Sequence, residues 1–182
     1  MIVSRGRYAS TGVAAGDPAA TVAEVAAYPA AAQLNPSRTI ALVVPIAAGG
    51  GEIHNHAGAS IYSVDHAILI DNGSEGEAYA ATAIVNDGLI EGRDGFGIKL
   101  IGLFDDSITN SGTIIGGNGT AIDMGRGDDI VMLTGASIVT GAILLGDGDD
   151  RLTGAASAET VDGGLGEDRI DTGGGDDVVA GG

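Results

Sequence analysis

The sequence predicts an all-β solenoid, in which short parallel strands stack coil upon coil. Two internal repeats predict this fold, one in the middle of the chain and one of nine residues near its end. The composition agrees, because 33 of the 182 residues are Gly and 44% are hydrophobic, while Cys and Trp are absent. That hydrophobic share is too large for a disordered acidic chain, although the formal net charge is −17.

Residues 1–50 differ from the rest and are predicted to form a short mixed cap or an assembly segment. Asp17 followed by Pro18 is typical of a helix start, so we expect a short helix over residues 18–28. Residues 39–46 are expected to form a strand. The open end of a solenoid exposes strand edges, and this segment is expected to cover them.

Residues 51–123 are predicted to form β-helix coils with a period of about 24 residues. The segment 81–100 aligns with the segment 105–124, and residues 60–74 are expected to form an earlier coil of the same kind. Asn and Gly mark the turns and aliphatic residues fill the strands, which resembles autotransporter and adhesin β-helices. The resemblance implies a right-handed parallel β-helix. The alignment pairs Ile84 with Ile108, Asn86 with Asn110, Gly88 with Gly112, Ile90 with Ile114 and Ile98 with Ile122.

Residues 124–182 carry a nine-residue repeat with Gly at positions two and four, Asp at position six and an aliphatic residue at position eight. Two units are adjacent, GGLGEDRID from Gly163 and TGGGDDVVA from Thr172. Two more begin at Leu145 and Met124, and a degenerate unit that has lost both glycines precedes Gly163. The aliphatic position is expected to point inward from a short strand and to stack on the next unit.

This nonapeptide resembles the calcium-binding repeat of RTX (hemolysin-type) proteins. The resemblance implies that the β-helix passes into an RTX-type calcium β-roll, in which units two apart stack on each other. Gly can turn its carbonyl toward a common point at no steric cost, and Ca²⁺ takes six to eight oxygen ligands. The calcium ligands are therefore expected at Gly125, Gly127, Asp129, Gly146, Gly148, Asp150, Gly164, Gly166, Asp168, Gly173, Gly175 and Asp177.

Stacking of alternate units predicts that Asp150 lies beside Asp168. The spacing from Asp129 to Asp150 exceeds two nonapeptides, so Asp129 joins the same column only if the intervening coil bulges by three residues. Glu159 faces Asp177, and the loss of both glycines there predicts weak calcium binding or none. From Asp123 to its end the chain has 13 acidic and 3 basic side chains, a net charge of −10, so this part is expected to need a counter-ion to fold.

Charge and hydropathy exclude several classes of partner. A pI near 4.1 disfavours nucleic acid and anionic membrane surfaces, both of which require a basic footprint. No apolar run approaches the roughly 18 residues of a membrane-spanning helix, and the start of the chain lacks the apolar core of a cleaved signal peptide. The RTX resemblance implies type I secretion with an uncleaved signal, and hence an extracellular or cell-surface location.

Catalytic function is not expected. The motifs HExxH and GxSxG and a Cys nucleophile are absent from the sequence. Asp105 and Asp106 leave a β-helical polysaccharide enzyme as a minor alternative, but adjacent carboxylates on a strand point to opposite faces and aromatic residues make up only 3% of the chain. His54 and His56 face the same way on a strand and could hold a transition metal, yet no third ligand is near in sequence, so ordinary surface histidines are favoured.

The sequence therefore favours a secreted, calcium-stabilised structural solenoid for adhesion, for a surface layer or matrix, or for a filament. The nonapeptide left unfinished at Gly181 and Gly182 predicts completion by residues 39–46 of another copy, giving a homo-oligomer or head-to-tail polymer. Truncation of a longer protein is an equally favoured interpretation. A cell-surface or matrix polysaccharide is a further candidate partner. The alternative function is a non-catalytic, calcium-dependent secretion and folding module of a type I-secreted enzyme or toxin.

Overall fold

The computed structural model describes residues 42–43, 51–71, 77–78 and 80–182, and every regular element in these ranges is a β-strand. None of these residues belongs to a helix, so none forms a helix able to span a membrane. The strands are β1 (Leu42–Val43), β2 (Gly51–Asn55), β3 (Ser60–Ser63), β4 (Ile68–Ile70), β5 (Thr82–Asn86), β6 (Leu89–Gly92), β7 (Ile98–Leu100), β8 (Ser107–Asn110), β9 (Thr113–Asp123), β10 (Ile130–Leu133), β11 (Ile138–Asp147), β12 (Arg151–Thr153), β13 (Thr160–Leu165), β14 (Arg169–Asp171) and β15 (Val178–Ala180).

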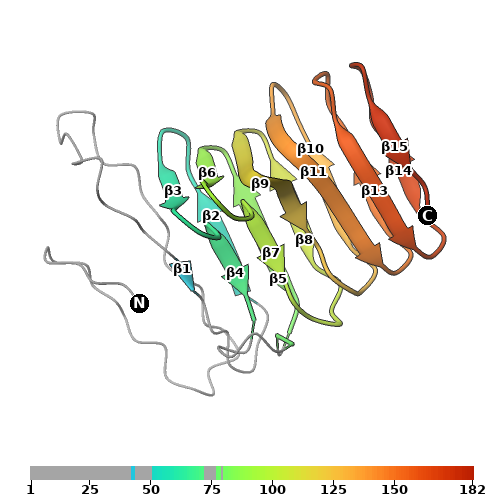
Figure 1. Ribbon diagram of the computed structural model, residues 1–182, viewed down its shortest axis with the longest axis horizontal. Helices are drawn as coiled ribbons and strands as arrows, with labels where there is room; N and C mark the ends of the chain where they lie inside the picture. The colour runs from blue at the N-terminus through green and yellow to red at the C-terminus, as the bar shows by residue number, and fades with distance from the viewer. Residues whose placement is uncertain (1–41, 44–50, 72–76, 79) are drawn as a thin grey trace, which may run out of the picture.

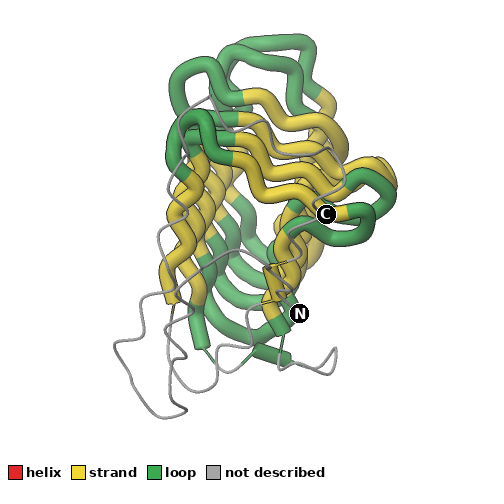
Figure 2. The backbone as a smooth tube through the Cα atoms, turned by 90° about the vertical axis from the view of Figure 1, so that its left-hand side faces the viewer, coloured by secondary structure: helices red, strands yellow, loops and turns green. Residues whose placement is uncertain are grey.

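The strands form two parallel sheets that follow the long axis of the molecule (Figure 1). One sheet has the order β2-β5-β8-β10-β12-β14, and the other runs from β1 and β4 through β7, β9, β11 and β13 to β15, with β3 and β6 beside this path. The chain visits the two sheets in turn, and we call each passage from one strand of the six-stranded sheet to the next a coil. Figure 2 shows the strands of successive coils lying in columns.

The lengths of the coils agree with the two predicted repeats. Asn86 pairs with Asn110 beside the pair of Ile84 and Ile108, which confirms the offset of 24 residues. Leu152 pairs with Ile170, and this offset of 18 residues equals two nonapeptides. The two coils between them are intermediate, because Ile108 pairs with Val131 at an offset of 23 residues and Val131 pairs with Leu152 at an offset of 21.

The first coil is longer than the repeat predicts. Asn55 pairs with Asn86, an offset of 31 residues. The coil also begins at β2 rather than within residues 60–74, which supply β3 and β4. Most of the extra length lies in the connection from β4 to β5, which is longer than the equivalent connection from β7 to β8, and the turn from β2 to β3 is also longer than that from β5 to β6.

Aliphatic side chains fill the interior in columns, because parallel pairing places equivalent residues of successive coils side by side. In the six-stranded sheet the column contains Ile84, Ile108 and Val131, which are 1%, 0% and 0% exposed. Equivalent columns run through the other sheet. Their buried members are Ile61, Ile90 and Ile114, and Ile68, Ile98, Ile122, Ile143 and Val161.

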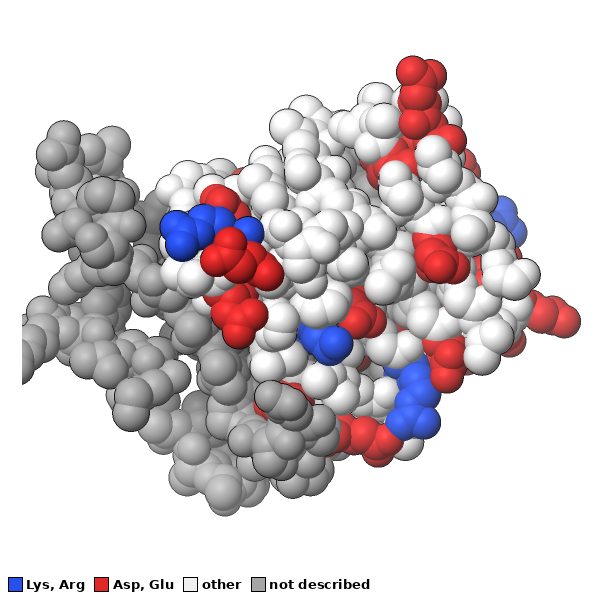
Figure 3. All heavy atoms as spheres, in the orientation of Figure 1, with Lys and Arg blue, Asp and Glu red and all other residues white. Residues whose placement is uncertain are grey.

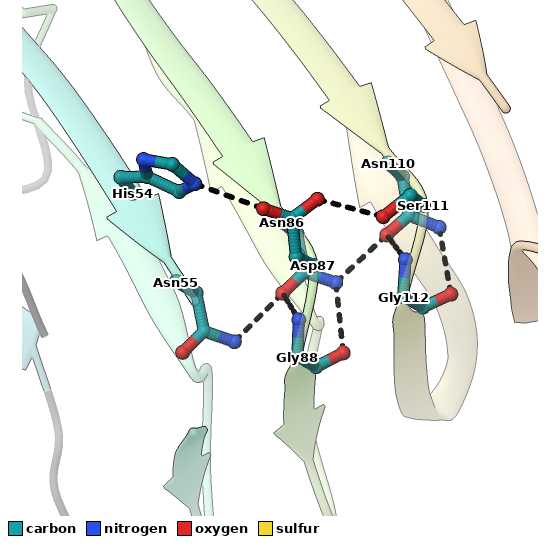
Figure 4. Close-up of polar contacts among 8 residues, drawn as sticks. All are labelled: His54, Asn55, Asn86, Asp87, Gly88, Asn110, Ser111 and Gly112. Carbon is teal, nitrogen blue, oxygen red and sulfur yellow. Dashed lines mark hydrogen bonds and ion pairs between the residues drawn. The ribbon is translucent and has the colours of Figure 1, made fainter. Parts of the chain in front are cut away.

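Buried asparagines hold the turns that follow β2, β5 and β8. The amide Nδ2 of Asn55 donates to Oδ1 of Asn86, and Nδ2 of Asn86 donates to Oδ1 of Asn110, both at 2.7 Å (Figure 4). All three side chains are 0% exposed. A side chain of this kind satisfies buried polar groups of the next coil, which explains why Asn recurs at this position of the repeat.

The expectations for the N-terminal segment fall mostly on residues outside the described ranges. The helix expected over residues 18–28 lies there, and so does most of the strand expected over residues 39–46. Leu42–Val43 within that range forms β1, which pairs in parallel with β4.

Truncation of Ile114 is expected to destabilise the fold irrespective of calcium. Ile114 is 0% exposed and lies between Ile90 and Val139 in adjacent coils. Ile114→Ala leaves an internal cavity, so we expect a loss of about 2–5 kcal/mol in the free energy of unfolding, measured by urea denaturation. The adjacent variant Ile115→Ala, on the less buried face of the strand, is the control, and an equal loss from both variants would contradict this packing.

Candidate metal site

The glycines of the nonapeptides adopt the backbone conformations that the repeat requires. Gly146 has a φ of 115°, and a Cβ on it would overlap the backbone carbonyl oxygen of Gly125 in the preceding coil. Gly164 stands in the same relation to the carbonyl oxygen of Gly146, with a φ of 88°. Only Gly tolerates both conditions, so the stack of carbonyl oxygens depends on it. Positive φ occurs at all eight expected positions, which are Gly125, Gly127, Gly146, Gly148, Gly164, Gly166, Gly173 and Gly175.

The aspartates at position six of three nonapeptides stack in one line with Asp106, and we call this line the inner acidic column: Asp106, Asp129, Asp150 and Asp168. Oδ1 of Asp168 accepts a hydrogen bond from the backbone N–H of Asp150 at 3.0 Å, which confirms the predicted stacking. Oδ1 of Asp150 accepts from the N–H of Asp129 at 2.8 Å, so the column continues across the longer coil between them. Each carboxylate therefore holds the backbone of the coil before it.

Asp106 extends the inner acidic column beyond the nonapeptides, and sequence reasoning missed it. Its N–H donates to Oδ1 of Asp129 at 2.7 Å, and its own Oδ1 accepts from the N–H of Thr82 at 2.6 Å. A signal was present in the sequence, since Asp105 and Asp106 precede the strand of Ile108 as Asp128 and Asp129 precede that of Val131. Gly102 precedes Asp106 as Gly125 precedes Asp129, but Phe104 replaces the second glycine, and this replacement concealed the match.

A second line of carboxylates runs beside the first on the solvent side, and we call it the outer acidic column: Asp105, Asp128, Asp149 and Glu167. Here the carboxylates of Asp105, Asp128 and Asp149 each accept a hydrogen bond from the coil that follows. Oδ1 of Asp128 accepts from the N–H of Asp149, and Oδ1 of Asp149 accepts from the N–H of Glu167, both at 2.9 Å. Within each pair of acidic residues, one carboxylate thus accepts a hydrogen bond from the preceding coil and the other from the following coil. This explains why two acidic residues recur together.

The inner acidic column contains buried oxygens that its hydrogen bonds do not satisfy. Oδ2 of Asp129, Asp150 and Asp168 is buried and has no hydrogen-bond partner among the described residues. The whole Asp129 and Asp150 residues are each 1% exposed. Burial of a carboxylate oxygen without a partner is costly, so the column has an unmet requirement for positive charge or for donors.

The pKa values of the column reflect this requirement. Burial raises the pKa of Asp129 to about 8, with the charges of Asp106 and Asp150 as lesser causes. Burial also raises the pKa of Asp106 to about 6, and that of Asp150 shifts upward for the same reason. Adjacent carboxylates of the column oppose one another's ionisation in the absence of a cation.

A third set of stacked carboxylates, on the opposite side from the acidic columns, contains only two residues, Glu159 and Asp177. Oδ1 of Asp177 accepts from the N–H of Glu159 at 2.9 Å, which confirms that the two residues face each other. Burial, followed by the charge of Asp177, raises the pKa of Glu159. The hydrogen bond from the backbone of Glu159 is the leading cause of the lowered pKa of Asp177. Gly173 and Gly175 of this side pack over the carbonyl oxygens of Ala155 and Ser157, the residues that replace glycine in the degenerate unit.

Comparisons of the chain with protein-family models, with curated proteins and with solved structures found no match.

Proposed function

We propose that this chain is a secreted, calcium-stabilised structural β-solenoid that serves adhesion, a surface layer or matrix, or filament assembly. In this proposal the parallel sheets close into a right-handed β-helix that passes into a calcium β-roll. The observation that carries it is the line of three carboxylates from consecutive coils, Asp129, Asp150 and Asp168, each with a buried Oδ2 that has no hydrogen-bond partner among the described residues.

The donor set suits calcium in its chemistry. Carboxylate and backbone carbonyl oxygens are hard ligands, which Ca²⁺ takes in sets of six to eight. Asp129 and Asp150 of adjacent coils would supply carboxylates, and the stacked turns that contain Gly125 and Gly146 would supply carbonyl oxygens. Bound calcium would supply the positive charge that the column lacks, so binding would appear directly as folding free energy. Asp168 with Asp150 forms the equivalent pair in the next coil.

The charge of the chain supports an extracellular role. The surface view in Figure 3 displays more acidic than basic side chains, in keeping with the formal net charge of −17. A chain of this charge folds more readily where calcium is abundant, and extracellular calcium modules bind at about 10⁻⁴–10⁻³ M. We infer that the chain remains unfolded in its calcium-binding part until export.

A structural role is favoured because the acidic pairs of successive coils are occupied in joining one coil to the next. Asp105 and Asp106, the acidic pair considered for catalysis, face different environments: Asp106 is 6% exposed and belongs to the inner acidic column, whereas Asp105 belongs to the outer one. Both carboxylates already bind backbone N–H groups. They are therefore engaged in holding coils together.

The second candidate is a non-catalytic, calcium-dependent secretion and folding module attached to a type I-secreted enzyme or toxin. The observation that favours it is that the offset of 18 residues, or two nonapeptides, occurs only from β11 onward among the described strands. This part of the chain could therefore be a module that folds under its own calcium requirement. Self-association separates the two candidates, since a structural solenoid assembles and a folding module does not need to.

The test is a calcium titration of the full chain, followed by circular dichroism and by light scattering with electron microscopy. We expect strand signal and melting temperature to rise with calcium, with a midpoint on the order of 10⁻⁴–10⁻³ M, and not with magnesium at the same concentration. An unchanged melt in excess chelator would refute the calcium requirement. Calcium-dependent particles larger than one chain support the structural role, whereas a strictly monomeric particle at high concentration supports the secretion and folding module.

A further inference from the structure

Two histidines and an aspartate from adjacent coils meet on one side of the first two coils. His54 lies in β2, His56 follows that strand, and Asp87 follows β5. Nε2 of His54 lies 2.9 Å from Oδ2 of Asp87, and the two imidazole rings lie 3.9 Å apart between centroids. One potential ligand atom from each of the three residues lies within 4.8 Å of the others.

The backbone brings these three residues together. β2 and β5 pair in parallel with His54 beside Val85, and the N–H of Asp87 donates to the carbonyl oxygen of Asn55 at 2.8 Å. The turn that carries His56 packs closely on the next coil, since a Cβ on Gly88 would lie 2.6 Å from the carbonyl oxygen of His56. Neither turn can move far without breaking these contacts, so the cluster is a fixed feature of the fold.

We propose that His54, His56 and Asp87 form a zinc-binding site that joins the first two coils. The site is separate from the acidic columns and does not depend on the proposed calcium function. Two imidazole nitrogens and one carboxylate oxygen are a donor set that zinc accepts, with water in the fourth position. Calcium is disfavoured at this cluster because it selects oxygen ligands.

The spacing of the donors suits a tetrahedral ion. Donors placed about 2.0–2.2 Å from zinc at tetrahedral angles lie roughly 3.3–3.5 Å apart. Nε2 of His54 and Oδ2 of Asp87 are 2.9 Å apart, so the distance between these two atoms needs to increase by only a few tenths of an ångström to admit the metal. The side chains of His54 and Asp87 are 35% and 37% exposed, which leaves a path for the ion and a place for water.

Ser111 in the third coil orients the carboxylate. Its Oγ donates to Oδ1 of Asp87 at 2.7 Å, while Oδ2 faces His54 (Figure 4). This hydrogen bond, and then the one with His54, are the first causes of the lowered pKa of Asp87. Hydrogen-bonded partners of this kind orient the ligands of metal sites and contribute to affinity. Zinc would therefore link β2 and β5 directly and the turn after β8 through Ser111.

The experiment is isothermal titration of zinc into the untagged full-length chain at saturating calcium, so that the acidic columns do not compete. We expect one zinc ion per chain, a rise in melting temperature, and a cobalt(II) spectrum of four-coordinate form. Asp87→Asn and His56→Gln should each weaken zinc binding by at least about 10-fold, and Ser111→Ala by about 10-fold. His66→Gln is the matched control, because His66 is the remaining histidine of the chain and lies outside the cluster.

The proposal is overturned if the wild-type chain binds no zinc, or if His66→Gln weakens binding as much as the cluster variants do. Circular dichroism of each variant checks that it folds, and should Asp87→Asn not fold, His56→Gln and Ser111→Ala carry the comparison. Zinc binding that persists in a chain without any response to calcium supports this site and counts only against the calcium function. Calcium-dependent folding without zinc binding supports the calcium function and counts only against this site.

Discussion

In the absence of calcium, the folded chain is expected to lose stability as the pH rises from 5 to 8, and this loss is expected to disappear when calcium is saturating. The reason lies in the inner acidic column. Burial raises the pKa of Asp129 to about 8 and that of Asp106 to about 6, whereas both are near 3.8 when the chain is unfolded. The folded state therefore retains protons that the unfolded state has released throughout this window.

The direction follows from linkage. A carboxyl whose pKa is raised on folding contributes most stability below its unfolded pKa and loses that contribution as the pH rises through its folded pKa. Calcium is expected to abolish the dependence, because it binds the ionised carboxylates and displaces their protons, so that neither the folded nor the unfolded state holds these protons between pH 5 and 8. Each pKa unit corresponds to about 1.4 kcal/mol, and a loss of about 1 kcal/mol lowers the melting temperature of a domain of this size by roughly 2–4 °C.

Thermal denaturation at pH 5, 6, 7 and 8, in chelator and in calcium, compares the two pH dependences. Asp129→Asn is the informative control, because Asn has no ionisable group and should flatten the dependence in chelator. If the wild-type chain in chelator were more stable at pH 8 than at pH 5, the column would not be a buried set of opposed carboxylates. A slope unchanged by Asp129→Asn would assign the effect to other groups.

Asp150→Asn is expected to weaken calcium binding strongly, whereas Asp149→Asn is expected to have little effect on it, although the two residues are adjacent. Asp150 is 1% exposed, and its Oδ2 has no hydrogen-bond partner among the described residues. Asp149 is exposed, and its Oδ1 accepts from the N–H of Glu167 at 2.9 Å. Removal of charge at Asp150 is expected to raise the calcium midpoint at least about 10-fold, equivalent to about 1.4 kcal/mol.

The same substitution should have a different effect without calcium. Asp150→Asn removes a buried charge that lies beside Asp129 and Asp168, so in chelator the variant is expected to be as stable as the wild type or more stable. Asp149→Asn should leave the calcium midpoint within about 2-fold. Calcium titrations followed by circular dichroism compare the variants, and equal midpoint shifts from both would show that the inner acidic column is not the ligand column.

Much of the register could be predicted from the sequence, because a parallel stack places equivalent residues of successive coils side by side. The longer repeat predicted the pairing of Ile84 with Ile108, and the nonapeptides predicted the contact between Asp150 and Asp168. Both follow from a simple physical rule: buried aliphatic and polar columns are satisfied only when like residues stack, so a fixed period in the sequence becomes a fixed offset in the sheet.

The position of Asp106 shows where this rule was insufficient. Its coil belongs to the longer repeat and has only one of the two glycines of the nonapeptides, Gly102, so the sequence placed it apart from them. In the structure the offsets decrease from coil to coil while the register at the end of each turn is preserved, and Asp106 therefore joins Asp129 and Asp150. Unequal connections take up the difference in length.

The amino-acid sequence by itself determined the strand periods, the glycine turns and the line of aspartates within the nonapeptides, because these depend on local conformation and on repetition. Only the tertiary structure decided that the two acidic columns hold coils in opposite directions, and that Asp87 lies against His54 and His56. His54 and Asp87 are 33 residues apart in sequence. Their contact depends on the long offset of the first coil, which the repeat did not predict, because the connection from β4 to β5 is free to vary in length while the paired strands are not.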